Sequence, residues 1–301
     1  MTTRRPLFVF NPAAGGGRHT ARLLPMVRAA VAAHGGAVVC TERPGHAVEL
    51  ARGAAAQRFD AVVGVGGDGT LHELANGLLD CGVGTPPALG AVPAGTGNDF
   101  VRSLGLPTDP SAAIDLVWAG ATQIIDLARC GERFFLNAGG VGFDSRVARD
   151  AQRIPKSLRI GTLPYVAGVL WEVIRNTSNE VVLELDEQRI QRRSLMVAIA
   201  NGAFYAGGMM ICPHAKRDDG LLDVCVVGEM PRRDVLRLLL SVFSGGHVGH
   251  PLVEFHRTRR LRIECAAGSE IQLDGELVGS LPAVFEVAPN ALRAIVPRTI
   301  G

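Results

Sequence analysis

The sequence predicts an α/β domain at the N-terminus, followed by an antiparallel β domain. In roughly the first 125 residues, short apolar runs alternate with segments whose apolar residues recur at helical spacing. Beyond that point, short strand-like runs follow one another with frequent turns, and one helical pattern, from Arg232 to Val242, interrupts them. The first pattern is typical of a parallel sheet covered on both faces, and the second of an antiparallel sheet.

The elements of the first domain follow in order. The runs expected as buried strands are Leu7–Phe10, Val38–Thr41, Ala61–Val65 and Leu89–Val92. Helical spacing appears at Leu23, Val27 and Val31, and again at Leu71, Leu74 and Leu78. Pro25 lies early in the first of these segments, so we expect that helix to start late or to kink.

The second domain is expected to consist mainly of strands, which alternate with turn residues. The strand-like runs are Val182–Asp186, Leu195–Ala200, Leu222–Val227, Leu261–Cys265, Glu270–Leu273 and Ala283–Val287.

Composition excludes several classes of protein. The 31 basic residues nearly balance the 29 acidic ones, which argues against a nucleic acid partner. The six cysteines include no Cys-x-x-Cys pair, so the sequence predicts neither a zinc site nor a disulfide framework and fits a reducing cytosol. No uncharged apolar stretch approaches the ~20 residues of a membrane span. We therefore expect a soluble, cytoplasmic protein.

Three glycine-rich loops follow strands of the first domain. They are Asn11–Arg18, Gly66–Thr70 and Pro93–Phe100. At the carboxyl ends of parallel strands, such loops bring backbone N–H groups close to a ligand, and helix N-termini behind them add positive potential. Any one of these loops could serve turn geometry alone, but three in one sheet indicate a polyphosphate site.

Asp68 indicates what kind of polyphosphate chemistry this is. No Gly-x-x-x-x-Gly-Lys-Ser/Thr motif occurs, and the dinucleotide fingerprint at Gly64–Gly69 lacks the acidic residue expected ~20 positions later. A carboxylate beside phosphates is repulsive unless a cation lies between them, and Mg²⁺ resolves this in phosphoryl transfer. Asp68 therefore favours a kinase over a dehydrogenase, with a helix-capping role as the alternative.

Two acidic clusters lie in the second domain. Glu276 of Asp274-Gly275-Glu276 could accept the hydroxyl proton of an alcohol as that alcohol becomes phosphorylated. Asp-Gly is also common in hairpin turns, and the residues alone favour this structural interpretation. The segment Asp218–Asp223 holds three acids and is either a hard-cation site or a solvated turn. The basic stretch Arg257–Arg262 is expected to form a solvated strand face.

These motifs together resemble the diacylglycerol-kinase catalytic-domain family of soluble lipid kinases. That family includes the bacterial diacylglycerol and phosphatidylglycerol kinases and is related to the sphingosine and ceramide kinases. The matching motifs are Asn11-Pro12…Gly15, Gly66-Gly67-Asp68-Gly69-Thr70, Gly95-Thr96-Gly97-Asn98-Asp99, Asp219-Gly220-Leu221-Leu222-Asp223 and Asp274-Gly275-Glu276, with a weaker echo at Gly161…Tyr165. The match departs at Arg18, where a Lys is common, and at His72, which replaces a frequent Asn.

The resemblance implies a fold and a domain division. An N-terminal three-layer α/β domain of the NAD-kinase and phosphofructokinase type would bind ATP. A C-terminal antiparallel β-sandwich would bind the lipid, with the active site in the cleft between the domains. A last strand would return to the first domain. The predicted domains are therefore residues 1–126 with about 291–301, and residues 127–290.

The resemblance also assigns residues to roles. Glu276 would be the proton acceptor, and Asp68 would act on the phosphates through a catalytic Mg²⁺. A second, structural Mg²⁺ would be bound by Asp219 with oxygens from Lys216 and Leu221, although Lys216 offers only its backbone carbonyl. Asp99 and Asp144 would lie at the lipid substrate. The expected ATP contacts are Asn11, Pro12, Ala13, Ala14, Gly15, Thr41, Gly66, Gly67, Asp68, Gly69, Thr70, Leu71, His72, Glu73, Gly95, Thr96 and Asn98.

The sequence thus predicts an ATP- and Mg²⁺-dependent lipid kinase that reaches its substrate at the membrane surface, with a homodimer left open. A NAD kinase, or another kinase with a soluble acceptor, is one alternative, but Asp274-Gly275-Glu276 has no place in it. The second alternative is a regulator that binds lipid or nucleotide without catalysis. It does not explain why Asp68, Asn98, Asp99 and Glu276 are all present.

Overall fold

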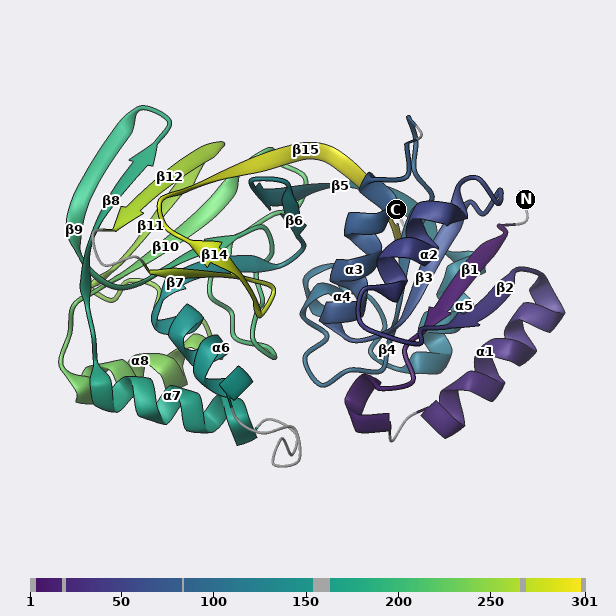
Figure 1. Cartoon of the computed structure of the whole chain (residues 1–301), viewed down its shortest axis with the longest axis horizontal. Helices are drawn as coiled ribbons and strands as arrows, with labels where there is room; N and C mark the ends of the chain where they lie inside the picture. The colour runs from purple at the N-terminus through teal and green to yellow at the C-terminus, as the bar shows by residue number, and fades with distance from the viewer. Residues whose placement is uncertain (1–3, 18–19, 83, 154–162, 266–268, 299–301) are drawn as a thin grey trace. The chain divides into compact units, whose positions relative to one another are not determined.

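The computed structural model describes residues 4–17, 20–82, 84–153, 163–265 and 269–298 (Figure 1). Arg18, Gly161 and the end of the expected returning strand, 299–301, lie outside the described residues. The chain forms two compact units, Met1–Leu127 with Pro289–Gly301 (unit 1) and Ala128–Ala288 (unit 2). The first division falls one residue after the boundary expected at 126/127.

Unit 1 contains a parallel sheet with the strand order β15-β4-β3-β1-β2. Its central strands are buried along their whole length, as expected for strands covered on both faces. The end of β15 pairs in parallel with β4 through Ala294 and Leu89. The strands are β1 (Pro6–Phe10), β2 (Ala37–Cys40), β3 (Ala61–Gly66), β4 (Ala88–Pro93) and β15 (Ala283–Val296).

Helices cover both faces of this sheet. On one face, α1 (Thr20–His34) and α5 (Pro110–Ala119) pack against alternate strand residues such as Phe8 and Phe10. On the other face, α3 (Asp68–Leu79) packs against Gly64, and α2 (His46–Ala54) packs against α3. The short α4 (Asp99–Ser103) follows β4. The predicted three-layer α/β architecture is confirmed.

One detail of the first helix differs from expectation. We expected this helix to start late or to kink at Pro25; it does not start late, because α1 begins at Thr20 and continues through Pro25 to His34. Helix α1 packs through Leu23 and Val27 against the sheet, and this burial outweighs the poor fit of proline in a helix.

Unit 2 is built from antiparallel strands around β9 (Gln188–Ala200), which pairs with three neighbours, β7 (Ala138–Gly142), β8 (Asn179–Leu185) and β10 (Leu222–Gly228). The long β5 (Ala121–Cys130) begins in unit 1, and its last residues, from Ala128, pair with β6 (Arg133–Phe135) in unit 2. The remaining strands are β11 (Val253–Thr258), β12 (Arg260–Cys265), β13 (Glu270–Leu273) and β14 (Glu276–Ser280). The predicted antiparallel, β-sandwich-like second domain is confirmed.

Two hydrophobic cores lie on opposite faces of the central strands of unit 2. Val197 and Ile199 of β9 face one core, which is built from strands. Their neighbours Met196, Ala198 and Ala200 face the other, which includes α8. Because successive side chains of a strand point to opposite faces, two cores require an unbroken apolar run, and Leu195–Ala200 is such a run.

Among the described residues of unit 2, the helices are α6 (Phe143–Arg153), α7 (Leu163–Arg175) and α8 (Arg232–Val242). They lie together below the strands in the view of Figure 1. Helix α6 contacts both α7 and the β13–β14 hairpin, and α7 contacts α8. The sequence indicated only α8.

Candidate active site

The predicted nucleotide-binding loops lie at the carboxyl ends of β1, β3 and β4 in unit 1. Because these strands are parallel neighbours, their ends lie at one edge of the sheet. Asn11 connects two of the loops, since its amide Nδ2 donates to Thr70 Oγ1 at 2.9 Å. Its Oδ1 accepts from Ala13 N at 3.0 Å, which shapes the start of the first loop.

The second and third loops touch through glycine. A Cβ added to Gly95 would lie 2.5 Å from the Cα of Gly67, and one added to Gly66 would lie 2.4 Å from Thr70 Oγ1. A side chain at Gly95 would force the two loops apart, and one at Gly66 would collide with Thr70 within the second loop. Asn98, held in the left-handed region at φ 56, donates through Nδ2 to Gly95 O at 3.1 Å. The loops therefore form one packed assembly of backbone.

The first loop adds a short 3-10 turn, η1 (Ala14–Gly17), in which Gly15 and Gly16 have φ of 59 and 73. This left-handed backbone disfavours other residues. Pro12 and Ala13 beside it are exposed, as is Thr96 of the third loop, while Thr41 follows β2 and donates its N–H to Phe10 O at 2.8 Å. The arrangement presents exposed, glycine-rich backbone, which is the kind of surface that binds phosphate oxygens.

Asp68 is the first residue of α3 and is partly exposed. Its Oδ1 accepts a hydrogen bond from Phe100 N at 3.0 Å, so the carboxylate also holds the start of α4. Mg²⁺ is usually bound through one or two carboxylates together with phosphate oxygens. Among the described residues, no three His, Cys, Asp or Glu side chains come together as a metal site. Asp68 therefore fits a metal ion for which a nucleotide supplies most of the ligands.

Three further expected ATP contacts, Leu71, His72 and Glu73, have side chains that are buried or bonded elsewhere in unit 1. Leu71 is buried and packs over Gly64. His72 is also buried. The carboxylate of Glu73 accepts from Gly45 N at 3.0 Å and from Ala47 N at 3.3 Å, so it caps the start of α2.

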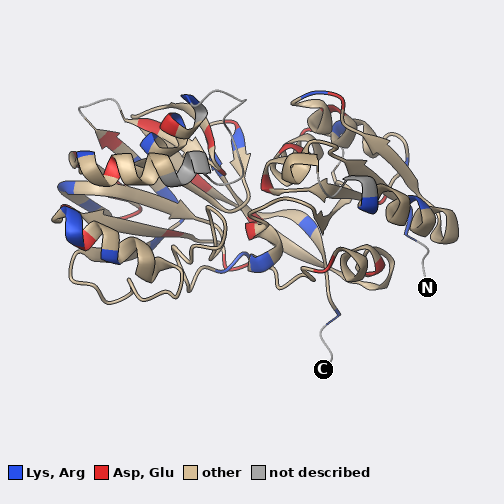
Figure 2. Ribbon diagram, turned by 90° about the horizontal axis from the view of Figure 1, so that it is seen from below, with Lys and Arg blue, Asp and Glu red and all other residues tan. Residues whose placement is uncertain are grey.

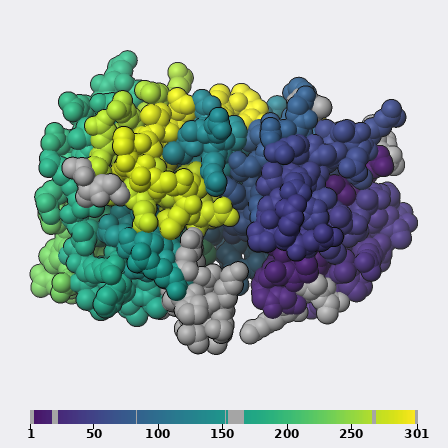
Figure 3. Space-filling model, viewed as in Figure 1, coloured from purple at the N-terminus to yellow at the C-terminus, as the bar shows by residue number. Residues whose placement is uncertain are grey.

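In unit 2, the two acids of the Asp274-Gly275-Glu276 turn have different surroundings. The carboxylate of Asp274 accepts hydrogen bonds from three consecutive backbone N–H groups, of Leu136 at 2.7 Å, Asn137 at 2.8 Å and Ala138 at 3.2 Å. Glu276, the first residue of β14, is exposed. The C-terminal segments that include this hairpin form part of the surface in Figure 3. Asp274 therefore anchors the turn, and Glu276 faces solvent.

A buried network connects this turn to Asp144. Gln272 accepts from Gly275 N through Oε1 at 2.8 Å and donates through Nε2 to Asp144 Oδ2 at 3.1 Å. Burial raises the pKa of Asp144 to about 6, against the opposing effect of the Gln272 hydrogen bond. A Cβ on Gly140 would lie 1.7 Å from Asp144 Oδ2, so glycine at that position makes room for the carboxylate.

Gln272 was not predicted as a site residue. Gln272 is 3% exposed and lies between the apolar residues Ile271 and Leu273. A polar residue between two apolar residues of a strand, next to the Asp274-Gly275-Glu276 motif, is the signal that indicates such a role.

Of the residues expected to bind a structural Mg²⁺, Asp219 has both carboxylate oxygens bonded within unit 2. Asp219 Oδ2 forms an ion pair with the guanidinium of Arg257, and its Oδ1 accepts from Leu221 N at 3.1 Å. The same guanidinium lies 3.6 Å from Asp223 Oδ1. Burial raises the pKa of Asp223 to about 6, and Arg257 opposes this shift. Arg257, expected on a solvated face, thus provides the positive charge at this loop.

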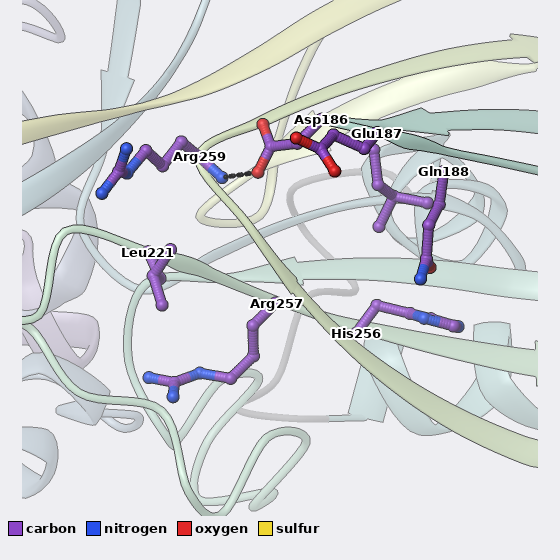
Figure 4. A pocket seen from close by; sticks show the side chains of 8 residues that line it. Asp186, Glu187, Gln188, Leu221, His256, Arg257 and Arg259 are labelled. Atoms are coloured by element: carbon purple, nitrogen blue, oxygen red, sulfur yellow. Dashed lines mark hydrogen bonds between the residues drawn. The ribbon is translucent and has the colours of Figure 1, made fainter.

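A separate open pocket of about 580 Å³ lies on unit 2 (Figure 4). Asp186 on its wall accepts from Arg259 N at 3.0 Å. Of the predicted site residues, only Leu221 lines this pocket. The lining residues are Leu185, Asp186, Glu187, Gln188, Leu221, His256, Arg257 and Arg259.

Comparison with known proteins identifies both units. A family model described as "Diacylglycerol kinase catalytic domain" matches residues 5–130. A second, described as "YegS C-terminal NAD kinase beta sandwich-like domain", matches residues 138–296.

Individual relatives agree with the family models. A diacylglycerol kinase of Mycobacterium tuberculosis is 36% identical over 256 residues, which are 83% of this chain and 81% of that protein. A diacylglycerol kinase of Staphylococcus epidermidis is 27% identical over 299 residues, or 99% and 93% of the two chains. A crystal structure from Bacillus anthracis str. Sterne aligns with a TM-score of 0.82 at 26% identity and covers 100% of this chain and 98% of that one. Because two family models match residues 5–130 and 138–296, and a diacylglycerol kinase is 36% identical over 83% of the chain, the chain belongs to the diacylglycerol kinase family.

Proposed function

We propose that the protein is an ATP- and Mg²⁺-dependent lipid kinase that transfers the γ-phosphate to a hydroxyl group of a lipid such as diacylglycerol. The observation that carries this proposal is that the two carboxylates of the Asp274-Gly275-Glu276 turn have different surroundings. Asp274 is fully engaged with the backbone and Glu276 is exposed, so the turn holds one carboxylate in place for chemistry. The names of the relatives, diacylglycerol kinase, support the same class of acceptor.

The nucleotide is assigned to unit 1. The packed loops around Asn11, Gly67 and Gly95 offer backbone N–H groups at the ends of three parallel strands. Such groups neutralise phosphate charge without reorganising during the reaction. Asp68 at the start of α3 would hold the catalytic Mg²⁺ on the phosphates, where the ion supplies charge neutralisation. No step is assigned to Asp219.

The acceptor side is assigned mainly to unit 2. Glu276 takes the proton from the lipid hydroxyl as the hydroxyl oxygen forms a bond to the γ-phosphorus. The bond from that phosphorus to the β–γ bridging oxygen breaks, and ADP leaves. Gln272, between Asp144 and Gly275, fixes the turn that carries Glu276 and is a positioning residue. We also assign Asp99, the buried first residue of α4 in unit 1, to the acceptor lipid.

This function is tested with labelled ATP, Mg²⁺ and mixed micelles that contain diacylglycerol, phosphatidylglycerol or a sphingoid base. We expect label on one lipid class. Label on added NAD instead would indicate a kinase with a soluble acceptor. Tight binding of Mg·ATP with no transfer to any acceptor would indicate a regulator.

A further inference from the structure

The helical side of unit 2 exposes large apolar side chains along two neighbouring helices. Leu236 and Leu240 of α8 and Phe243, the residue directly after it, are spaced like one stripe of a helix and are 45%, 70% and 55% exposed. On α7, the exposed apolar residues are Leu170, Trp171 and Ile174, at 53%, 50% and 56%. We call these six residues the α7–α8 face. Helices α7 and α8 contact each other and pack against the same core, so their exposed stripes both face away from that core.

These residues are not needed to cover the core of unit 2. The opposite side of α8 supplies Val235, Leu238 and Val242 to the hydrophobic core, and Val173 of α7 packs against the same core. The apolar side chains of the α7–α8 face are therefore not explained by packing against the core. Contiguous exposed apolar surface of this kind marks an interaction site.

The exposed charges on the two helices are mainly positive. Arg233 and Arg237 have side chains that are each 77% exposed, Arg232 is exposed, and Arg175 is 40% exposed. Of the two acids on these helices, Glu172 is completely buried in ion pairs, and Asp234 lies beside Arg237 at 3.2 Å. Figure 2 shows the Lys and Arg residues of unit 2 in blue, seen from below. The α7–α8 face is thus an apolar surface with a basic border.

We propose that the α7–α8 face docks unit 2 onto an anionic phospholipid bilayer. Helices with Trp, Phe and Leu on one side and Arg beside them lie in the plane of a membrane interface. The Arg175 guanidinium lies 5.1 Å from the centre of the Trp171 ring, which places a cation and an amphipathic ring together. Neither helix is long and apolar enough to span a bilayer among the described residues, so the docking is peripheral.

Charge favours a membrane over a second copy of this chain. A two-fold contact through this face would bring the arginines of one copy against those of the other, with only one partly exposed acid per copy on these helices. Anionic headgroups complement the same arginines. This inference rests on the proposed function, because a diacylglycerol acceptor lies within a bilayer. Helix α6, which starts beside Asp144, contacts α7, so the docking face and the acceptor side share one unit.

The experiment measures sedimentation of the whole protein with vesicles of phosphatidylcholine, with and without phosphatidylglycerol, in the absence of ATP. We expect stronger binding to the anionic vesicles. The double variant Ile174→Glu/Leu240→Glu should weaken this binding at least about tenfold, because it removes two apolar side chains that docking would bury in the bilayer and adds charge repulsion. Arg233→Gln/Arg237→Gln should weaken binding to anionic vesicles about tenfold and leave binding to neutral vesicles unchanged.

The matched control is Ile124→Glu, on β5 in unit 1, because Ile124 is 53% exposed, close to the 56% of Ile174. It should bind vesicles as the wild type does. Thermal unfolding of each variant checks that the exposed substitutions leave the fold intact. Equal binding by the double variant and the control, or no binding by the wild type, would overturn the inference. A dimeric wild type that the double variant converts to monomer would show an interface between copies and would also overturn it.

A second assay separates this inference from the proposed function. Phosphoryl transfer to a short-chain diacylglycerol dissolved below its micelle concentration needs no membrane. The double variant should retain wild-type transfer to this acceptor and lose transfer to diacylglycerol in vesicles. Absence of transfer by the wild type to either acceptor would contradict the proposed function, while the sedimentation result decides the docking inference by itself.

Discussion

At the scale of single residues, Asp274 and Glu276 show how two nearby acids in one motif take separate roles. Asp274 satisfies the N–H groups of Leu136, Asn137 and Ala138, all of which belong to buried residues. Removal of the Asp274 carboxylate leaves these N–H groups without their hydrogen-bond acceptor, and in a buried site water does not fully replace it. Glu276 makes no comparable set of bonds to backbone among the described residues.

The first prediction contrasts these two residues. Asp274→Ala should lower the free energy of unfolding by about 3 kcal/mol, through the unsatisfied N–H groups. Glu276→Gln should leave the unfolding free energy within about 0.5 kcal/mol of the wild type and reduce kcat by at least about a hundredfold. Denaturant unfolding and steady-state kinetics measure the two effects. Wild-type kcat in Glu276→Gln would exclude it as the proton acceptor.

The second prediction concerns Asp144. Its pKa is about 6 in the folded protein because of burial, whereas in the unfolded chain it ionises with a pKa of about 3.9. Below the unfolded pKa both states are protonated and the group has no effect. As pH rises from about 4 to about 6, the unfolded chain loses its proton first, so the folded state loses stability.

Asp144→Asn removes this titration. We therefore expect the variant to gain stability relative to the wild type as pH rises through this range, by about 2–3 kcal/mol in total, and to show no further change above it. Asp223, whose pKa is also raised to about 6, titrates in both proteins and cancels in the comparison. Denaturant unfolding at several pH values tests this. Parallel curves for the two proteins would show that Asp144 does not titrate in this range.

At the scale of elements, the loops after β3 and β4 act together because Gly67 and Gly95 are in contact. Gly69, in contrast, has open space where a Cβ would be and lies in the first turn of α3. A substitution at Gly95 therefore tests the packing of the loops, whereas one at Gly69 tests the approach of a ligand.

The third prediction uses this difference. Gly95→Ala should destabilise the protein by about 2 kcal/mol and raise the KM for ATP, because the loops must move apart. Gly69→Ala should leave stability unchanged or slightly higher, since alanine favours a helix, and should raise only the KM for ATP. Thermal unfolding and ATP titration distinguish the two. An unchanged KM in both variants would place the nucleotide elsewhere.

The loop before β10 provides the fourth prediction. Arg257 of β11 pairs with Asp219 and lies near Asp223, so the loop carries its own counter-charge. We expect EDTA to leave the melting temperature of the nucleotide-free protein unchanged. Arg257→Ala should cost about 1–2 kcal/mol, because it leaves two neighbouring carboxylates without their cation. A large drop in melting temperature of the wild type with EDTA would show that a metal ion binds there.

At the scale of the whole molecule, the sequence predicted the fold class and most strands because apolar runs and turn residues are local signals. Helix α8 was expected at Arg232–Val242 and lies there. Helix α6 was missed because its sequence is mostly polar and its apolar positions are few. Helix α7 was missed because small and apolar residues occur on several of its sides.

Contacts between distant residues were beyond local signals. Gln272 and Asp144 are 128 positions apart, and Arg257 and Asp219 are 38 apart. Their pairing depends on the register of β13 against β7 and of β11 against β10, which a single sequence does not specify. The resemblance to a family therefore gave site residues, and the structure gave their partners.

Phosphoryl transfer to a lipid with Glu276 as proton acceptor is tested by comparing three forms of the protein. Wild type, Glu276→Gln and Glu270→Gln, a control for a second acid of the same hairpin, are incubated with labelled ATP, Mg²⁺ and diacylglycerol micelles. We expect labelled lipid with the wild type and with Glu270→Gln, and at least about a hundredfold less labelled lipid with Glu276→Gln. Equal transfer by all three proteins, or label on no lipid at all, would contradict it.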